Sequence, residues 1–356
     1  MIVFHMYSQS LTPFHKGSQD LADPLGNHAI IILQYFLKNY KHCRLYSSIY
    51  IYRIWRVNAV RPYCAEVMKM KYLLAFVLIG IFLTGCAADY VTIRGQRFVI
   101  GSTELRLTGL GMSDGDIIPL RYMTNLIRLD LSGNQISDLT PLANLTNLTS
   151  LCIASNQIND LTSLAELTNL RSLTIASNQI NDITLLAGLT NLYGLRMGSN
   201  QISDITSLAD LTNLTLLHID SNQINDITPL AGLTNLWHLS LFGNQISDIT
   251  PLANLTSLES LHLSDNQISD ITPLANLTNL RRLTLERNQV SDISTLAYLT
   301  NLTTLNLADN KIVDITPLAD LPFFATGIPG VRLTLGGNPI SDWLPIEHFV
   351  DVRGRP

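Results

Sequence analysis

Apolar side chains recur along most of the chain with a fixed period of 22 residues. Within each period, leucine, isoleucine or valine alternates with other residues just before an asparagine, as in Leu173, Ile175 and Asn178. Alternation of this kind predicts a short β-strand with one buried face. Apolar residues also follow most of the asparagines at positions two, five, eight and eleven. These three-residue steps predict short 3₁₀-like turns on the back of each repeat.

Two polar residues also recur at fixed positions of the repeat, and we call each set of equivalent residues a column. The first comprises Asn134, Asn156, Asn178, Asn200, Asn222, Asn244, Asn266, Asn288, Asn310 and Asn338, and only the last spacing, 28 residues, departs from 22. An asparagine amide donates and accepts hydrogen bonds, so we expect this column to hold the turns. The second runs from Asp138 to Asp342, before each back segment, where a carboxylate can accept a backbone hydrogen bond. We therefore do not interpret the net charge of −11 over residues 86–356 as a sign of cation or basic-partner binding.

The span Leu-x-x-Leu-x-Leu-x-x-Asn from Leu170 to Asn178 is the signature of a leucine-rich repeat. Segments such as NQISDITPLANLTNL resemble the internalin-like leucine-rich repeats of bacterial surface proteins, and the resemblance covers about residues 101–356. The resemblance implies an α/β-type, right-handed solenoid with a parallel β-sheet on its concave face, 3₁₀-like turns on its convex face, and a binding role for the concave face. The sequence shows no sortase motif or cell-wall module after the repeats, and this departure puts a role in host invasion in doubt while it leaves the repeat fold untouched.

Residues 68–86 have the layout of a secretory signal peptide. Lys69 and Lys71 precede twelve apolar residues, which are too few to span a hydrocarbon core of about 30 Å. The Leu-Thr-Gly-Cys ending resembles the lipobox of bacterial lipoproteins, in which the signal is cut before the cysteine and the cysteine is acylated. This resemblance implies a lipidated Cys86 that anchors the protein to a membrane in the bacterial cell envelope, outside the cytoplasm.

The residues before that signal differ in composition from the rest. Residues 1–67 carry seven Lys+Arg against three Asp+Glu and hold seven of the 12 Tyr. A signal peptide acts at an N-terminus, so we expect translation to start at Met68 or Met70; the alternative is a cytoplasmic extension. The expected divisions are residues 1–67 upstream of the native protein or disordered, a signal peptide at 68–85, a tether and strand-turn-strand N-cap at 86–100, the repeat domain at 101–342 and a C-terminal cap at 343–356. We expect the C-terminal end of the core to be closed by Trp343, Leu344, Ile346, Phe349 and Val350.

The repeats differ from one another mainly on the exposed side of the strands. The positions two and four residues before each asparagine vary, whereas the Thr-Asn pair before the strand, as at Thr168-Asn169, barely varies. Variation on the concave face favours a binding surface there. The alternative is that the turn positions carry structural constraints of their own.

Bulky side chains cluster in four consecutive repeats. The concave patch comprises Tyr193, Arg196, His218, Asp220, Trp237, His238, Phe242 and His262, and a charged flank beside it comprises Arg281, Arg282, Glu286 and Arg287. Exposed Trp, Tyr and Arg are frequent interface anchors. The clustering therefore predicts partner binding by these residues; the alternative is isolated surface aromatics, which need no explanation.

Other functions fit the sequence less well. His218, Ser240 and His262 are residue types used by hydrolases, but strand N–H groups are committed to the sheet and leave no oxyanion hole. Zinc is not expected, because His218 and His262 are two repeats, about 10 Å, apart. No cofactor or internal disulfide is expected, and the acidic charge gives no nucleic-acid footprint. The sequence thus predicts a non-enzymatic, lipid-anchored monomer that binds a protein; a glycan-binding adhesin or an envelope scaffold is the alternative.

Overall fold

The computed structural model describes residues 89–324, 326, 330–349 and 352–355. The chain divides into two compact units, Met1–Ala87 and Ala88–Pro356, and all described residues lie in the second. The predictions for residues 1–67, for the signal peptide and for Cys86 fall outside this description. Within the described residues, no helix has the length and apolar character needed to cross a membrane.

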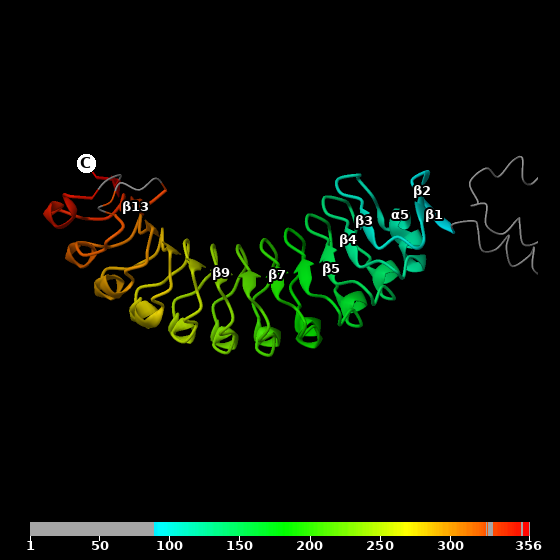
Figure 1. Ribbon diagram of the computed structural model, residues 1–356, viewed down its shortest axis with the longest axis horizontal. Coiled ribbons are helices and arrows are strands. Elements are labelled where there is room, and N and C mark those ends of the chain that lie inside the picture. The colour runs from blue at the N-terminus through cyan, green and yellow to red at the C-terminus, as the bar shows by residue number, and fades with distance from the viewer. Residues whose placement is uncertain (1–88, 325, 327–329, 350–351, 356) are drawn as a thin grey trace, which may run out of the picture. The chain divides into compact units, whose positions relative to one another are not determined.

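Twelve parallel strands form one sheet, in which neighbours along the chain are neighbours in space (Figure 1). They are β3 (Glu104–Arg106), β4 (Arg128–Asp130), β5 (Ser150–Cys152), β6 (Ser172–Thr174), β7 (Gly194–Arg196), β8 (Leu216–His218), β9 (His238–Ser240), β10 (Ser260–His262), β11 (Arg282–Thr284), β12 (Thr304–Asn306), β13 (Arg332–Thr334) and β14 (Val352–Arg353). Equivalent positions pair in register, as Leu217 does with Leu239. In Figure 1 the strands line the inner, concave side of this unit.

Short 3₁₀ turns line the outer side of the same coils (Figure 1). They are η1 (Ile118–Tyr122), η2 (Thr140–Leu142), η3 (Thr162–Leu164), η4 (Thr184–Gly188), η5 (Thr206–Leu208), η6 (Thr228–Leu230), η7 (Thr250–Leu252), η8 (Thr272–Asn276), η9 (Ser294–Tyr298), η10 (Thr316–Leu318) and η11 (Leu344–Ile346). The predicted solenoid with a parallel sheet and 3₁₀ turns is confirmed. One helical turn, α5 (Asp114–Ile117), was not predicted, and Ser113 and Asp116 form a capping box at its start.

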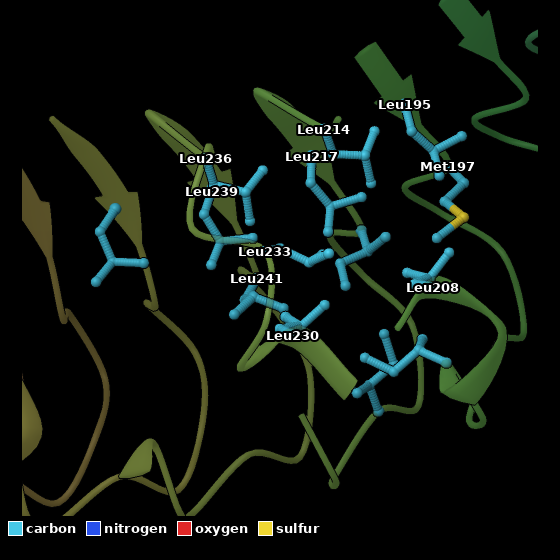
Figure 2. Packing of buried hydrophobic residues seen from close by; sticks show 14 of the residues in the cluster. Leu195, Met197, Leu208, Leu214, Leu217, Leu230, Leu233, Leu236, Leu239 and Leu241 are labelled. Atoms are coloured by element: carbon cyan, nitrogen blue, oxygen red, sulfur yellow. The ribbon is translucent and has the colours of Figure 1, made fainter. Parts of the chain in front are cut away.

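The core is a continuous stack of aliphatic side chains between the sheet and the turns. Leu217 and Leu239 project inward from their strands and Leu230 projects from η6, and all three are fully buried (Figure 2). Each coil packs on the coils before and after it, so burial depends on neighbours rather than on one central core. The cluster extends without a break from Val91 to Phe349.

The asparagine column ties each coil to the one before it. Asn156 Oδ1 accepts a hydrogen bond from Ile136 N at 3.0 Å. Its Nδ2 donates to the carbonyl oxygens of Leu131 and Ile153, both at 3.1 Å. The same pattern recurs along the column, so the predicted use of both ends of the amide is confirmed.

The aspartate column holds the start of each 3₁₀ turn. Asp160 Oδ1 accepts a hydrogen bond from Thr162 N at 2.8 Å, and the other nine aspartates make the equivalent bond. Hydrogen bonds from the hydroxyl and backbone N–H of Thr162 lower the pKa of Asp160. The predicted capping role is confirmed, and it accounts for much of the acidic charge.

A β-hairpin covers the first coil. Strands β1 (Tyr90–Ile93) and β2 (Gln96–Val99) pair antiparallel, and the turn between them contains Gly95 at φ +81°, a conformation that glycine adopts without strain. The strand-turn-strand that the sequence predicts is therefore present. Val91 and Ile93 are buried against the core.

The C-terminal segment closes the other end. Ile346 is fully buried, and the ring of Phe349 lies 5.9 Å from that of Phe324. The prediction that Leu344 also closes this end is wrong: Leu344 is 69% exposed. It is the first residue of η11, a position that faces outward in the other coils as well. Strand β14 was also not predicted, and Val350 lies outside the described residues.

Candidate functional site

The concave patch lies on four neighbouring strands, β7 to β10. In β8 and β9 the central residues, Leu217 and Leu239, are buried, so the residues on either side of them face away from the core. Arg196, His218, His238 and His262 consequently share the concave face.

Three histidine rings form a row across β8, β9 and β10. The ring of His238 lies between the other two, with centroids 4.7 Å from His218 and 5.4 Å from His262. The rings of Trp237 and His238 make a T-shaped contact, with their centroids 5.6 Å apart. Four rings therefore form one continuous surface across three coils.

Sequence reasoning missed the place of His238 in this row, because it compared only His218 with His262. The two-residue period does put His238 on the same face as Ser240, and that was the available signal. Both ring nitrogens of His262 are engaged by hydroxyls, Nε2 with Ser260 at 3.1 Å and Nδ1 with Thr284 at 3.3 Å. In the part of the chain that the structure describes, no group of three His, Cys, Asp or Glu side chains is placed to hold a metal ion.

Asp220 joins two coils of the patch. Its Oδ1 accepts hydrogen bonds from the hydroxyl of Ser240 and, at 3.2 Å, from the backbone N–H of Phe242. The hydroxyl of Ser240 is thus paired with a carboxylate, whereas in a Ser-His-Asp triad the serine hydroxyl is paired with the histidine. Neighbouring His218 presents a buried Nε2 with no hydrogen-bond partner. This arrangement orders the surface without building a catalytic triad.

Three large aromatic side chains rise from the patch. Tyr193 is 51% exposed, Trp237 46% and Phe242 41%. Tyr193 and Trp237 occupy equivalent positions, with Thr215 on the coil between them. Thr215 N donates a backbone hydrogen bond to Tyr193 O, and Trp237 N donates one to Thr215 O. They therefore stand two coils apart, about 10 Å, and Tyr193 extends the patch beyond the row of rings.

The charged flank is largely paired with side chains of its own coil and of the adjacent coils. The guanidinium nitrogens of Arg287 lie 3.3 Å from Asp265 Oδ1, 3.7 Å from Glu286 Oε1 and 3.9 Å from Asp309 Oδ2. Arg287 follows β11, and its backbone has a left-handed conformation with φ at +53°. Sequence reasoning missed the partners Asp265 and Asp309, which belong to the turns of adjacent coils. Such exposed pairs contribute little to stability, but they reduce the charge left for a partner.

The other flank residues are engaged as well. Arg281 pairs with Glu259 at 3.8 Å, and Glu286 accepts a hydrogen bond from Asn306 Nδ2 at 2.8 Å. Arg282 pairs in register with Ser260, two residues before His262 on the neighbouring strand, and its charge lowers the pKa of His262, after the larger effects of burial, which lowers it, and of Asp220, which raises it. The flank is thus continuous with the patch through Arg282.

Burial keeps the histidine row uncharged near neutral pH. Burial, together with smaller effects of the adjacent His218 and His262, lowers the pKa of His238 to about 4, against an opposing effect of Asp220. The pKa values of His218 and His262 are also lowered, in both cases mainly by burial. At neutral pH the row therefore presents aromatic rings rather than positive charges.

Lowering the pH from about 7 to about 5 should destabilise the wild-type protein more than a His238→Ser variant. The folded-state pKa of His238 lies below its ordinary value of 6.5, so between these values the unfolded chain binds a proton that the folded chain does not. The free energy of unfolding therefore falls as the pH falls. Because His238 is partly exposed, we expect a difference of roughly 1 kcal/mol.

Urea unfolding of both proteins at the two pH values measures this difference. Serine is a suitable replacement because Ser260 occupies the same position in the next coil. Equal losses of stability in the two proteins would show that His238 is not held neutral by its surroundings.

The Thr-Asn pairs have a structural role. Asn169 Nδ2 donates to Thr146 O, in the preceding coil, at 2.9 Å, and the equivalent asparagines form the same bond. Their recurrence is therefore explained by a second ladder between coils. The contrast between constant turns and variable strands does not by itself indicate binding, and the case for the patch rests on its side chains.

Matches to known proteins agree with this architecture. A family profile described as leucine-rich repeats (2 copies) matches seven stretches, which together cover residues 124–166 and 168–320, more than half of the chain. No match was found among curated proteins.

Solved structures give the same result. An internalin (inlF) from Listeria monocytogenes is 34% identical, with a TM-score of 0.60 over 74% of this chain and 90% of that chain. A leucine-rich repeat protein from Leptospira interrogans is 27% identical, with a TM-score of 0.58 over 63% of this chain and 58% of that chain. A plant peptide hormone receptor, RGFR1, in complex with RGF2, shares the fold at 21% identity and a TM-score of 0.53, over 68% of this chain and 49% of that chain. The chain belongs to the leucine-rich repeat family and is internalin-like within it.

Proposed function

We propose that this chain is a non-enzymatic, lipid-anchored protein of the bacterial cell envelope that binds a protein partner through the concave patch. The observation that carries the proposal is the row of rings formed by Trp237, His238, His218 and His262. The row lies on the exposed face of a rigid sheet, beside Phe242 and Tyr193.

The chemistry of the patch suits a macromolecular surface. Trp237 and Phe242 offer large contact areas at a small cost in side-chain entropy, which is why such residues often dominate protein interfaces. The bond from Phe242 N to Asp220 and the stacking of His238 hold the neighbouring groups in place. A partner would therefore meet a largely preformed surface.

Comparative affinity capture tests the proposal. The wild-type repeat region and a Trp237→Ala, Phe242→Ala double variant are used as paired baits on envelope extracts. We expect at least one protein to be retained by the wild type and lost from the variant. A set of captured proteins that is identical for the two baits would contradict binding through the patch.

A glycan is the second candidate ligand, because exposed aromatic rings such as Trp237 and Tyr193 also stack on sugars. Applying the wild-type repeat region and the double variant to a glycan array distinguishes a glycan ligand from a protein ligand. Glycan binding that disappears in the double variant, without a captured protein, would replace the protein partner by a sugar. The patch would then keep its role with a different ligand.

The membrane anchor follows from the lipobox resemblance and is tested on Cys86. Because acylation needs the cysteine thiol, a Cys86→Ser variant should accumulate as unprocessed precursor, and the wild-type protein should partition into detergent. Intact mass spectrometry should show a mature chain that begins with an acylated Cys86. A mature protein that retains residues 1–67 would contradict this assignment.

A further inference from the structure

The outer face of the N-terminal hairpin carries two large apolar side chains that are half-exposed in the described structure. Val91 and Ile93 point into the core, so Tyr90 and Thr92 point outward. Tyr90 pairs with Val99 in the hairpin register, which places both on the outer face, and each is 49% exposed. The hairpin therefore seals the core on one side and presents an aromatic and an aliphatic side chain on the other.

The first coil adds to this concentration of exposed apolar side chains. Ile118 and Tyr122 in η1, which β1 contacts, are 44% and 60% exposed. Of the thirteen large hydrophobic side chains exposed among the described residues, six lie within residues 90–127: Tyr90, Val99, Leu110, Ile118, Tyr122 and Ile127. This stretch is a small part of the described chain, so exposed apolar surface is gathered at its N-terminal end.

Arginines accompany the two tyrosines. The guanidinium of Arg97 lies 4.3 Å from the ring centroid of Tyr90, and that of Arg121 lies 5.9 Å from that of Tyr122. Residues 90–127 hold four Arg against three Asp+Glu, a net charge of +1, whereas residues 128–356 hold 10 Lys+Arg against 21 Asp+Glu, a net charge of −11. The N-terminal end is thus less acidic than the rest of the solenoid taken together.

We propose that the outer face of the β1–β2 hairpin, together with η1, docks on the surface of the lipid bilayer. Tyrosine is enriched at the membrane interface because its ring is apolar and its hydroxyl is polar. Arginine keeps its charge at the headgroups while its stem covers apolar surface, and anionic lipids attract it. The paired Tyr90 and Arg97 have this chemistry on one face.

The inference rests on the proposed lipidation of Cys86, which supplies the reason why this end meets a bilayer. Only residues 87–89 separate Cys86 from Tyr90 in the sequence. Four Cα–Cα steps reach at most about 15 Å, so an acylated Cys86 keeps the hairpin within reach of the headgroups. A docked hairpin would hold β9, six strands beyond β3, about 30 Å along the solenoid from the membrane.

Depth-dependent fluorescence quenching on the acylated, full-length product tests the docking. A Thr92→Cys substitution in a Cys152→Ala background places a nitrobenzoxadiazole label on the outer face of the hairpin. A Ser291→Cys substitution, exposed in a distant coil, is the matched control. The proteins are reconstituted in phosphatidylcholine vesicles with about 30% phosphatidylglycerol and with doxyl-labelled lipid as the quencher.

We expect at least about twofold quenching at position 92 and almost none at position 291. A Tyr90→Ser, Tyr122→Ser variant should show less quenching at position 92, although intact mass spectrometry shows that it carries the same acyl groups.

Equal, weak quenching at both positions of an acylated protein would overturn the docking and leave the lipid anchor standing. Protection of the label at position 92 that depends on protein concentration and not on vesicles would identify a second copy as the occupant instead, and would also overturn it. A mature mass without acyl groups would refute the anchor, and the docking with it.

Discussion

An Asn244→Ala variant should lose at least about 3 kcal/mol of its free energy of unfolding. The side chain of Asn244 is only 8% exposed. Its Oδ1 accepts a hydrogen bond from Ile224 N at 3.1 Å, and its Nδ2 donates to the carbonyl oxygens of Ile219 at 3.0 Å and Leu241 at 3.1 Å. Alanine removes all three bonds, and each buried backbone group left without a partner costs about 1–3 kcal/mol. Urea unfolding measures the loss.

Asn235→Ala is the matched control for this prediction, because it makes the same substitution in the same coil, nine residues earlier in the chain. Asn235 is exposed and donates a single hydrogen bond, to Thr212 O at 2.9 Å. Water can replace that bond, so the expected loss is about 1 kcal/mol or less. Similar losses in the two variants would show that the buried asparagine column is not the main tie between coils.

Trp237→Ala and Phe242→Ala should each weaken partner binding about 30-fold or more, which corresponds to about 2 kcal/mol. Both side chains are more than 40% exposed and lie outside the buried columns, so their removal should change stability by no more than about 1 kcal/mol. Isothermal titration with the captured partner measures binding, and thermal unfolding checks the fold.

Matched controls come from the early coils, where the same face carries small side chains. Thr174→Ala in β6, in the column of His218, and Ala176→Ser, in the column of Phe242, alter concave positions of one early coil. We expect almost no change in affinity from either substitution. Small and equal effects in all four variants would mean that the aromatic patch is not the binding surface.

The fold was predictable because its determinants repeat. Each coil carries leucine, asparagine and aspartate at the same positions. A structural role inferred for Asn156 or Asp160 can therefore be compared with the equivalent residues of all ten repeats in the same chain. The hydrogen bonds that these two residues form follow from their side-chain chemistry and their fixed place in the period.

The details that departed from the repeat were less predictable. The ring of His238 touches rings on both neighbouring strands diagonally, whereas a comparison along one column pairs only His218 with His262. The ion pairs of Arg287 depend on the direction of a side chain after a left-handed turn, which periodicity does not specify. Strand β14 belongs to a tail without the period, where only three-dimensional packing decides. The outward position of Leu344 was within reach of the sequence, because the first residue of the other 3₁₀ turns faces outward as well.

Site-specific photocrosslinking along one column of the sheet edge tests the central claim most directly. A benzoylphenylalanine residue replaces, one at a time, Thr149, Arg171, Tyr193, Trp237, Arg281 and Thr303, which occupy equivalent positions in different coils. If the concave patch binds the partner, the yield of one protein adduct in living cells should be greatest at Tyr193 and Trp237 and should fall toward Thr149 and Thr303. A uniform yield along the column, or a maximum at either end, would contradict partner binding through the patch.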